Sequence, residues 1–307
     1  MQNAAIEVWR GGVNPWQCDQ MGHMNVRFYV AHAGEGLAGV AAGLGMAGAF
    51  SPAATSTLVI REHHIRFLRE ALAGAALHMD AGVLRLDEAE ADVLQVLRHS
   101  RTDEPSAVFH TRLAHARATD AQAFPWPRAA RSRAEKITVA VPPGLGPRSL
   151  ALGEPTAEAS LARAESLGLA RYGAGAFMPQ DCDAFGRVLA HQIMGRMGDG
   201  AAQAIAATRE AVGPVSVGGE PVGLAVVEYR LIYFAWPGAG DRYDVRSGLR
   251  VAEPRRLGWN HWMLDPDTGR PWAVAVGVLV PFDLQARKTV TLPDEALAVL
   301  KSRLVAF

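Results

Sequence analysis

The stretch CDQMGHMN, residues 18–25, places a carboxylate, a glycine, a histidine and an asparagine within eight positions. A helical pattern follows it at once, because the next apolar residues recur at steps of three and four: Val26, Val30, Ala33, Leu37, Val40 and Leu44. Gly45 then suits the end of a helix, where a left-handed residue is common. The sequence therefore predicts a polar loop that leads directly into one long amphipathic helix.

A second version of this loop occurs later, as CDAFGRVL at residues 182–189. Asp19 and Asp183 match at an offset of 183 − 19 = 164, and the neighbouring cysteine and glycine of each loop match at the same offset. Further on, Glu62 matches Glu228 at an offset of 228 − 62 = 166. Matches in the same order at almost one offset indicate two copies of one unit.

Each copy has the same pattern of elements: a short strand, the loop, a helix, and then four strand-like segments. The strands are expected at 5–13, 57–68, 76–87, 92–100 and 106–116, and again at 172–178, 222–234, 241–252, 256–264 and 271–282. The second helix is expected from Leu189 to Val212, with Gly213 as its stop. A helix combined with an antiparallel meander predicts an α+β fold, in which the helix packs on one sheet.

We expect three regions along the chain: residues 1–120 as the copy with the complete loop, 121–165 as a proline-rich irregular linker, and 166–307 as the second copy. Thr156 and Glu158 suit the first turn of a short helix before the second copy, and a terminal helix is expected to begin near Pro293. In the strand around 258–264, Trp259 and Trp262 are expected to pack in the core.

The composition excludes several classes of protein. The chain has 307 residues with 31 basic and 31 acidic side chains, which argues against a nucleic-acid partner. Its two cysteines form no C-x-x-C pair, and the adjacent His63 and His64 would point to opposite faces of a strand, so we expect no metal site. The uncharged stretch 37–60 is too rich in Ala and Gly for a membrane span, and no signal peptide is visible; the expectation is a protein of the reducing cytoplasm.

The motif Asp-x-x-Gly-His-x-Asn-x-x-x-Tyr, here Asp19, Gly22, His23, Asn25 and Tyr29, resembles the signature of hotdog-fold acyl-CoA thioesterases of the 4-hydroxybenzoyl-CoA thioesterase type. The segment VIREHHIRFLREALAG, residues 59–74, also resembles the strand that follows the helix in that family. The resemblance implies two tandem hotdog units, each a long helix on an antiparallel sheet, paired as a double hotdog. It also implies a thioester hydrolase that needs no cofactor beyond the coenzyme A of its substrate.

The resemblance further implies roles for the residues of the first loop. Asp19 would be the nucleophile or the general base, and His23 would orient the loop or contact the thioester. Gly22 would let the backbone approach the substrate closely, and Asn25 would cap the helix. The helix N-terminal amides near Val26 would then bind the developing oxyanion. Tyr29 is assigned to substrate binding, with core packing as the alternative.

The second loop lacks part of the motif, because Arg187 replaces the histidine and Leu189 replaces the capping asparagine. We expect Arg187 to pair with Asp183 and the loop shape to persist, so that each chain has one working site. Copy two would supply walls of that site, through the strand around Glu228. A non-catalytic acyl-CoA-binding hotdog protein is the main alternative, and a hydratase on the same fold ranks last. The acyl group and the choice between coenzyme A and acyl carrier protein stay open; a homodimer is expected.

Overall fold

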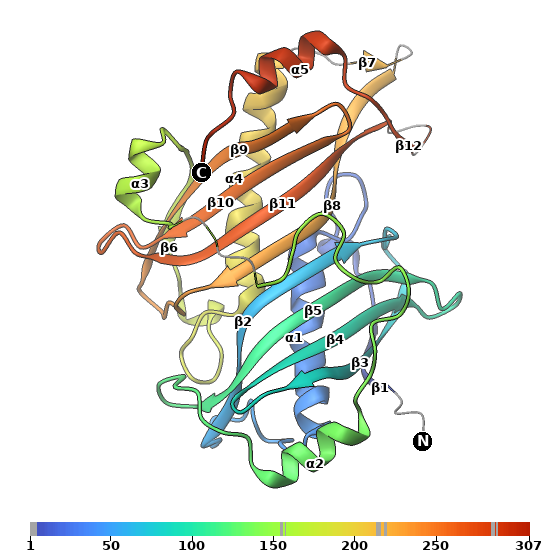
Figure 1. The fold of residues 1–307 in the computed structure, drawn as a ribbon, viewed down its shortest axis with the longest axis vertical. Helices are drawn as coiled ribbons and strands as arrows, with labels where there is room; N and C mark the ends of the chain where they lie inside the picture. Colours follow the sequence, from blue (N-terminus) through green and yellow to red (C-terminus); the bar gives the residue numbers. More distant parts are fainter. Residues whose placement is uncertain are drawn as a thin grey trace. The chain divides into compact units, whose positions relative to one another are not determined.

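The computed structural model describes residues 5–153, 156, 158–212, 216–217, 220–283, 286 and 288–307 (Figure 1). The chain divides into two compact units. Unit 1 comprises Met1–Pro147 together with Pro179–Met194, and unit 2 comprises Arg148–Met178 together with Gly195–Phe307. The second polar loop, residues 182–189, therefore belongs to unit 1.

Unit 1 is an antiparallel sheet of five strands with one long helix, α1, behind it (Figure 1). The strand order is β1-β3-β4-β5-β2. The bounds are β1 (Ile6–Gly12), α1 (Val26–Gly43), β2 (Ser56–Phe67), β3 (Ala76–Leu86), β4 (Glu90–His99) and β5 (Pro105–Arg117), with the short 3₁₀ turn η1 (Pro15–Gln17) before the first loop.

The predicted apolar stripe of α1 faces the sheet. Val30, Ala33, Leu37 and Val40 are each at most 1% exposed, which confirms the helical spacing. Gly39 lets the helix lie close to β1, because a Cβ there would come within 2.7 Å of the Val8 side chain. Burial of this stripe provides the hydrophobic core that holds the start of α1, and so the first loop, in place.

A buried polar network crosses the core of unit 1 from α1 through β4 and β5 to β2. The Gln95 amide donates to the Ala33 carbonyl at 2.8 Å, and the Thr111 hydroxyl donates to Gln95 Oε1 at 3.3 Å. His63 Nδ1 lies 2.9 Å from Thr111 Oγ1, and since that hydroxyl already donates to Gln95, Nδ1 must carry the proton. Burial lowers the pKa of His63 to about 3, so its ring is neutral.

Unit 2 repeats the arrangement, with strand order β8-β11-β10-β9-β6 and a second long helix, α4. Two short strands, β7 (Ser216–Val217) and β12 (Lys288–Thr289), pair with β8 and β11. The other bounds are α3 (Leu161–Ser166), β6 (Ala170–Ala176), α4 (Ala190–Val212), β8 (Glu220–Tyr233), β9 (Arg242–Glu253), β10 (Arg256–Leu264), β11 (Pro271–Asp283) and α5 (Asp294–Lys301). The 3₁₀ turn η2 (Pro179–Asp181) and the first residues of α4 belong to unit 1. Trp259 and Trp262 are both buried, in two different clusters, as the sequence predicts.

The expected linker is not irregular throughout, which corrects the sequence interpretation. It contains the nine-residue helix α2 (Arg128–Lys136), with Pro127 at its N-cap. Proline fixes φ near the value that a helix start needs, and Ala130 and Ala134, one turn apart, are buried. The short helix α3 is present, but it begins after Ser160, whose side chain accepts from the Arg163 amide, rather than near Thr156. The Gly213 stop lies outside the described residues.

The segment after α2 runs over the outward face of the unit 1 sheet. Arg66 Nη1 donates to the carbonyls of Gly144 and Gly146, each at 2.7 Å, and His110 Nε2 contacts the Leu145 carbonyl at 3.1 Å. Leu145 itself packs against the apolar cluster of Leu94, Val96 and Val108 on β4 and β5. Side chains of the sheet thus satisfy the polar backbone of this irregular stretch.

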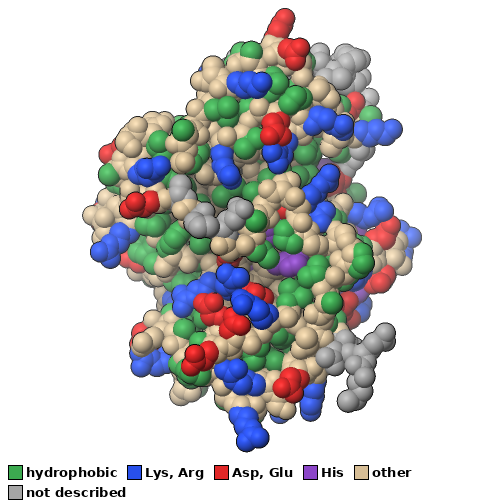
Figure 2. All heavy atoms as spheres, viewed as in Figure 1, with side chains coloured by type: hydrophobic (Ala, Val, Ile, Leu, Met, Phe, Trp, Pro, Cys, Tyr) green, Lys and Arg blue, Asp and Glu red, His purple; other side chains and the backbone are tan. Residues whose placement is uncertain are grey.

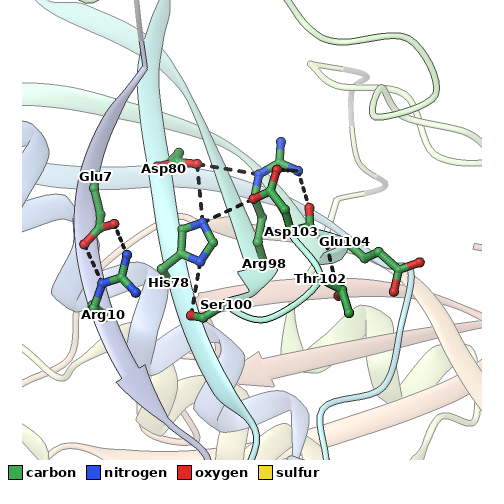
Figure 3. Close-up of polar contacts among 9 residues, drawn as sticks. All are labelled: Glu7, Arg10, His78, Asp80, Arg98, Ser100, Thr102, Asp103 and Glu104. Atoms are coloured by element: carbon green, nitrogen blue, oxygen red, sulfur yellow. Dashed lines mark hydrogen bonds and ion pairs between the residues drawn. The ribbon is translucent and has the colours of Figure 1, made fainter.

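Charged side chains of both signs lie intermixed on the face drawn in Figure 2, in keeping with the balanced composition. One polar cluster joins β3, β4 and the turn after β4 (Figure 3). His78 Nε2 lies 3.9 Å from Asp80 and 3.5 Å from Asp103, and Arg98 Nε lies 3.5 Å from Asp80. Because Asp103 is largely exposed, such pairs each contribute at most about 1 kcal/mol, and the cluster serves to order the turn.

Candidate functional site

The first loop is closed by its own aspartate. Asp19 Oδ1 accepts from the amides of Met21 at 2.8 Å and His23 at 3.1 Å, and the Asp19 amide donates to the His23 carbonyl at 2.8 Å. Gly22 has φ +79°, a conformation that glycine adopts without a steric penalty. In the described part of the chain, no hydrogen-bond donor contacts Asp19 Oδ2. One carboxylate oxygen therefore shapes the loop, and the other is available to a ligand.

The loop ends at the N-terminus of α1, where Asn25 forms the expected cap. Its side-chain oxygen accepts from the Arg27 amide at 2.9 Å, and its carbonyl accepts from Phe28 at 2.8 Å. The Val26 amide has no acceptor among the described residues, as is usual for the first turn of a helix. Here it combines with the positive end of the helix dipole, which favours negative charge at this position.

His23 is held by a partner that the sequence does not reveal. Its Nε2 lies 3.4 Å from Glu70 Oε2, and its backbone forms an antiparallel bridge with Leu72. The Met24 amide donates to the Ala71 carbonyl at 2.8 Å and fastens the same two segments. Glu70 and His23 are 47 residues apart, so only the fold brings them together.

Tyr29 lies one turn into α1 and is buried, 5% exposed. Its hydroxyl accepts from the Ala71 amide at 3.3 Å and lies 3.5 Å from Ser106 Oγ. Burial raises the pKa of Tyr29 above its ordinary value, and the charge of Asp19 adds to the shift. The phenol is thus a neutral link between α1 and the segment that carries Glu70.

A second series of polar contacts links the residues just before the loop to side chains of α1. Gln17 accepts from the Asn14 amide at 2.8 Å, and its Nε2 lies 3.4 Å from Nε2 of the buried His32. His32 Nδ1 lies 3.2 Å from Glu35 Oε2, and this hydrogen bond lowers the pKa of Glu35. Sequence reasoning missed Gln17 and His32, although the spacing of His32 and Glu35 by three residues in a helix was a signal that the two could pair.

The segment Pro179–Met194 supplies two more side chains to this region of unit 1. Arg27, at the second position of α1, donates from Nη2 to Gln192 Oε1 at 2.7 Å. Burial lowers the pKa of His191, and the charge of Arg27 adds to that effect. The sequence expectation that copy two contributes to the copy-one site had pointed to the strand around Glu228, and not to the start of α4.

Glu228 lies in unit 2, buried beneath the linker. Its carboxylate accepts from three consecutive amides, those of Arg148 at 2.9 Å, Ser149 at 2.8 Å and Leu150 at 3.4 Å. The structure thus holds Asp19, Gly22, His23, Asn25 and Val26 in one loop and at its junction with α1, buries Tyr29 against Ala71 and Ser106, and gives Glu228 the linker amides as partners.

The second loop has the same backbone as the first. Asp183 Oδ1 accepts from the amides of Phe185 at 2.8 Å and Arg187 at 2.9 Å, and Gly186 also has φ +79°. The predicted pairing is present as well, because Arg187 Nε lies 3.3 Å from Asp183 Oδ2. The oxygen that has no described donor in Asp19 is therefore bonded to an arginine in Asp183.

Comparison with known proteins matches both copies to one family. The family model described as Thioesterase-like superfamily matches residues 13–134 and 177–300, one segment for each copy. No curated protein matches the chain. None of the helices in the described part is long and apolar enough to cross a lipid bilayer.

Three solved structures share the fold over most of their length. A putative oleoyl thioesterase from Lactobacillus plantarum has a TM-score of 0.66 at 9% identity, covering 91% of this chain and 97% of that one. An acyl-ACP thioesterase from Bacteroides thetaiotaomicron has a TM-score of 0.61 at 10% identity, covering 88% and 96%. A 12:0-ACP thioesterase from Umbellularia californica has a TM-score of 0.61 at 10% identity, covering 90% and 94%.

These similarities confirm the expected fold, two tandem hotdog units in one chain. The family model matches the chain twice, once in each of the two copies that the internal repeat predicts. The chain belongs to the Thioesterase-like superfamily.

Proposed function

We propose that this chain is an acyl-CoA thioesterase of the 4-hydroxybenzoyl-CoA thioesterase type, which hydrolyses a thioester to a carboxylic acid and free coenzyme A. The observation that carries the proposal is the first loop. Among the described residues, Asp19 Oδ2 accepts no hydrogen bond, and the Val26 amide at the start of α1, which Asn25 caps, donates none. A carboxylate and an oxyanion-binding amide are the two groups that thioester hydrolysis needs.

Asp19 serves as the nucleophile or as the general base. As the nucleophile, Oδ2 attacks the thioester carbonyl carbon, the carbon–sulfur bond breaks, and coenzyme A leaves as the thiolate; water then hydrolyses the mixed anhydride. As the base, the same oxygen takes a proton from a water molecule that attacks the carbonyl. In both routes the carbonyl oxygen becomes negative, and the Val26 amide and the α1 dipole stabilise it.

His23 and Gly22 have supporting roles in this proposal. The left-handed turn at Gly22 would bring the backbone of the loop close to the substrate, and the contact with Glu70 would orient the His23 ring, whose backbone amide is bonded to Asp19. The second loop keeps its shape but has no free carboxylate oxygen, so each chain has one working site. We further propose that the chain forms a homodimer, for which light scattering should give twice the 32.8 kDa mass.

The test is a thiol-release assay of the pure protein with acyl-CoAs of several chain lengths and with aryl-CoAs. We expect release from at least one of them. Absence of release from all of them, with folded protein, contradicts the proposal for coenzyme A thioesters, and the same panel on acyl carrier protein then separates the two carriers. Ligand-induced stabilisation without any turnover would favour the non-catalytic acyl-CoA binder.

A further inference from the structure

Large apolar side chains remain exposed around the first loop. Trp16 is 74% exposed, Met21 is 51% exposed and Leu72 is 52% exposed. A single exposed apolar residue is ordinary on a protein surface, but a group of them beside a polar site marks a surface that binds an apolar ligand or partner.

All three residues are fixed to the loop that carries Asp19. Trp16 lies in η1, whose Pro15 carbonyl accepts from the Cys18 amide at 3.1 Å. Met21 is at the tip, with its amide bonded to Asp19, and Leu72 forms a backbone bridge with His23. We call this group the apolar rim: Trp16, Met21 and Leu72.

The second copy provides an internal comparison. At the offsets of the repeat, Gln180 stands where copy one has Trp16, and Gly238 stands where it has Leu72. Phe185 replaces Met21, but it is partly buried, and the Arg187 guanidinium lies 4.8 Å from its ring centre. The three rim positions are therefore filled by a glutamine, a glycine and a partly buried phenylalanine beside the loop whose aspartate is paired with arginine, although Met178, just before that loop, is 50% exposed.

We infer that the apolar rim binds the acyl group of the substrate and sets the preference for its length. The inference rests on the proposed function, because it takes the ligand of the loop to be an acyl thioester. A chain lying over Trp16, Met21 and Leu72 would place its carbonyl at Asp19, while each methylene that is buried strengthens binding. Coenzyme A would contribute equally to the binding of every acyl length.

The experiment measures binding of S-alkyl-CoA thioethers, which cannot be hydrolysed, by calorimetry. In the wild type we expect affinity to rise by about twofold to fourfold per methylene from methyl-CoA to dodecyl-CoA. In Trp16→Ser and in Leu72→Ser we expect dodecyl-CoA to bind roughly tenfold more weakly, with methyl-CoA unchanged. Thermal unfolding establishes that both variants fold.

Phe50→Ser is the matched control, since Phe50 is 36% exposed and follows the far end of α1, a helix of 18 residues and thus about 27 Å long. It should bind every thioether as the wild type does. The rim is refuted if folded Trp16→Ser and Leu72→Ser retain wild-type affinity for dodecyl-CoA, or if they weaken methyl-CoA and dodecyl-CoA by the same factor.

This design distinguishes failure of the acyl-binding rim from failure of the proposed thioesterase activity. Length-dependent binding that needs the rim, without turnover of any thioester, supports the rim and contradicts the hydrolase. Turnover of acyl-CoAs by a protein whose affinity does not depend on the rim supports the hydrolase and contradicts the rim.

Discussion

Asp19 and Asp183 have the same backbone surroundings and differ in one side-chain contact. In both loops Oδ1 accepts from two amides and so fixes the turn. The second oxygen decides the difference: in Asp183 it is bonded to Arg187, and in Asp19 it has no described donor. A residue that looks duplicated in the sequence thus accepts hydrogen bonds at both carboxylate oxygens in one copy and, among the described residues, at one oxygen in the other.

Exchanging each carboxylate for an amide tests this difference. Asparagine keeps an oxygen for the two loop amides but cannot act as a nucleophile or base, so Asp19→Asn should lower kcat by at least about 100-fold without unfolding the protein. Asp183→Asn should leave kcat within about tenfold, with some loss of stability from the unpaired Arg187. Steady-state kinetics and thermal unfolding of both variants give the answer. Loss of turnover in a folded Asp183→Asn protein, with activity kept in Asp19→Asn, would reverse the assignment.

The contact between His23 and Glu70 gives a second prediction at this scale. Glu70→Gln keeps the size of the side chain and removes its charge, so the hold on the His23 ring weakens. We expect kcat to fall by roughly tenfold while KM changes little, because Glu70 acts through His23. Glu70→Asp should recover part of the loss. A change in KM alone would show that Glu70 serves binding.

The two long helices, α1 and α4, differ in the residue at their N-cap. α1 begins with a side-chain cap from Asn25, whereas α4 follows Leu189, whose side chain has no acceptor to offer. The two helices therefore start from loops of one shape with unequal stabilisation.

Substitutions at the two cap positions test this difference. Asn25→Ala should lower the free energy of unfolding by about 1 kcal/mol, and Asn25→Ser should restore most of it. Leu189→Asn adds a cap to α4 and should offset the apolar contacts that the half-buried leucine loses. Urea unfolding of the three variants measures this. Equal stability of Asn25→Ala and the wild type would show that the cap does not stabilise α1.

The network of Ala33, Gln95, Thr111 and His63 makes the sheet of unit 1 sensitive to acid. The pKa of His63 is about 3 in the folded chain, compared with about 6.5 for an ordinary histidine. Above pH 6.5, His63 is neutral in the folded and the unfolded chain, so its titration costs no stability. As the pH falls from 6.5 towards 3, His63 takes up a proton only in the unfolded chain. The free energy of unfolding should therefore fall by up to about 1.4 kcal/mol per pH unit in this window.

His63→Gln removes this titrating group, so denaturant unfolding between pH 7 and pH 4 should show a shallower loss of stability than the wild type. His261 in unit 2 gives an independent check, because burial lowers its pKa to about 4 and His261→Gln should also flatten the curve. A wild-type slope that both variants retain would mean that neither histidine stays neutral in the fold.

At the scale of the whole molecule, duplication supplies two loops of one shape, and among the described residues both carboxylate oxygens of Asp183 accept hydrogen bonds whereas only one oxygen of Asp19 does. We expect one molecule of S-alkyl-CoA to bind per chain in calorimetry, because the rim and the unpaired Asp19 occur only in copy one. Asp183→Asn should leave that stoichiometry at one. A stoichiometry of two would show that the second loop still binds the ligand.

The sequence by itself determined the fold class, the repeat and the composition of the loop. Helix period, strand spacing and turn residues are local signals, and the predicted elements agree with the observed bounds to within a few residues. The pairing of Arg187 with Asp183 was also predictable, because the two residues are four positions apart in one short loop and carry opposite charges. The helix α2 was missed because Pro125 and Pro127 directly precede it and its apolar pattern is limited to a few alanines.

Only the tertiary structure decided which distant groups meet the loop. Glu70 reaches His23 because the segment after β2 bridges back to the loop, and Gln192 reaches Arg27 because the segment 179–194 packs into unit 1. Glu228 is held by linker amides whose path has no periodic signal in the sequence. Such contacts depend on how a core of apolar residues brings separate elements together, and burial is a property of the whole fold and not of any short stretch of the chain.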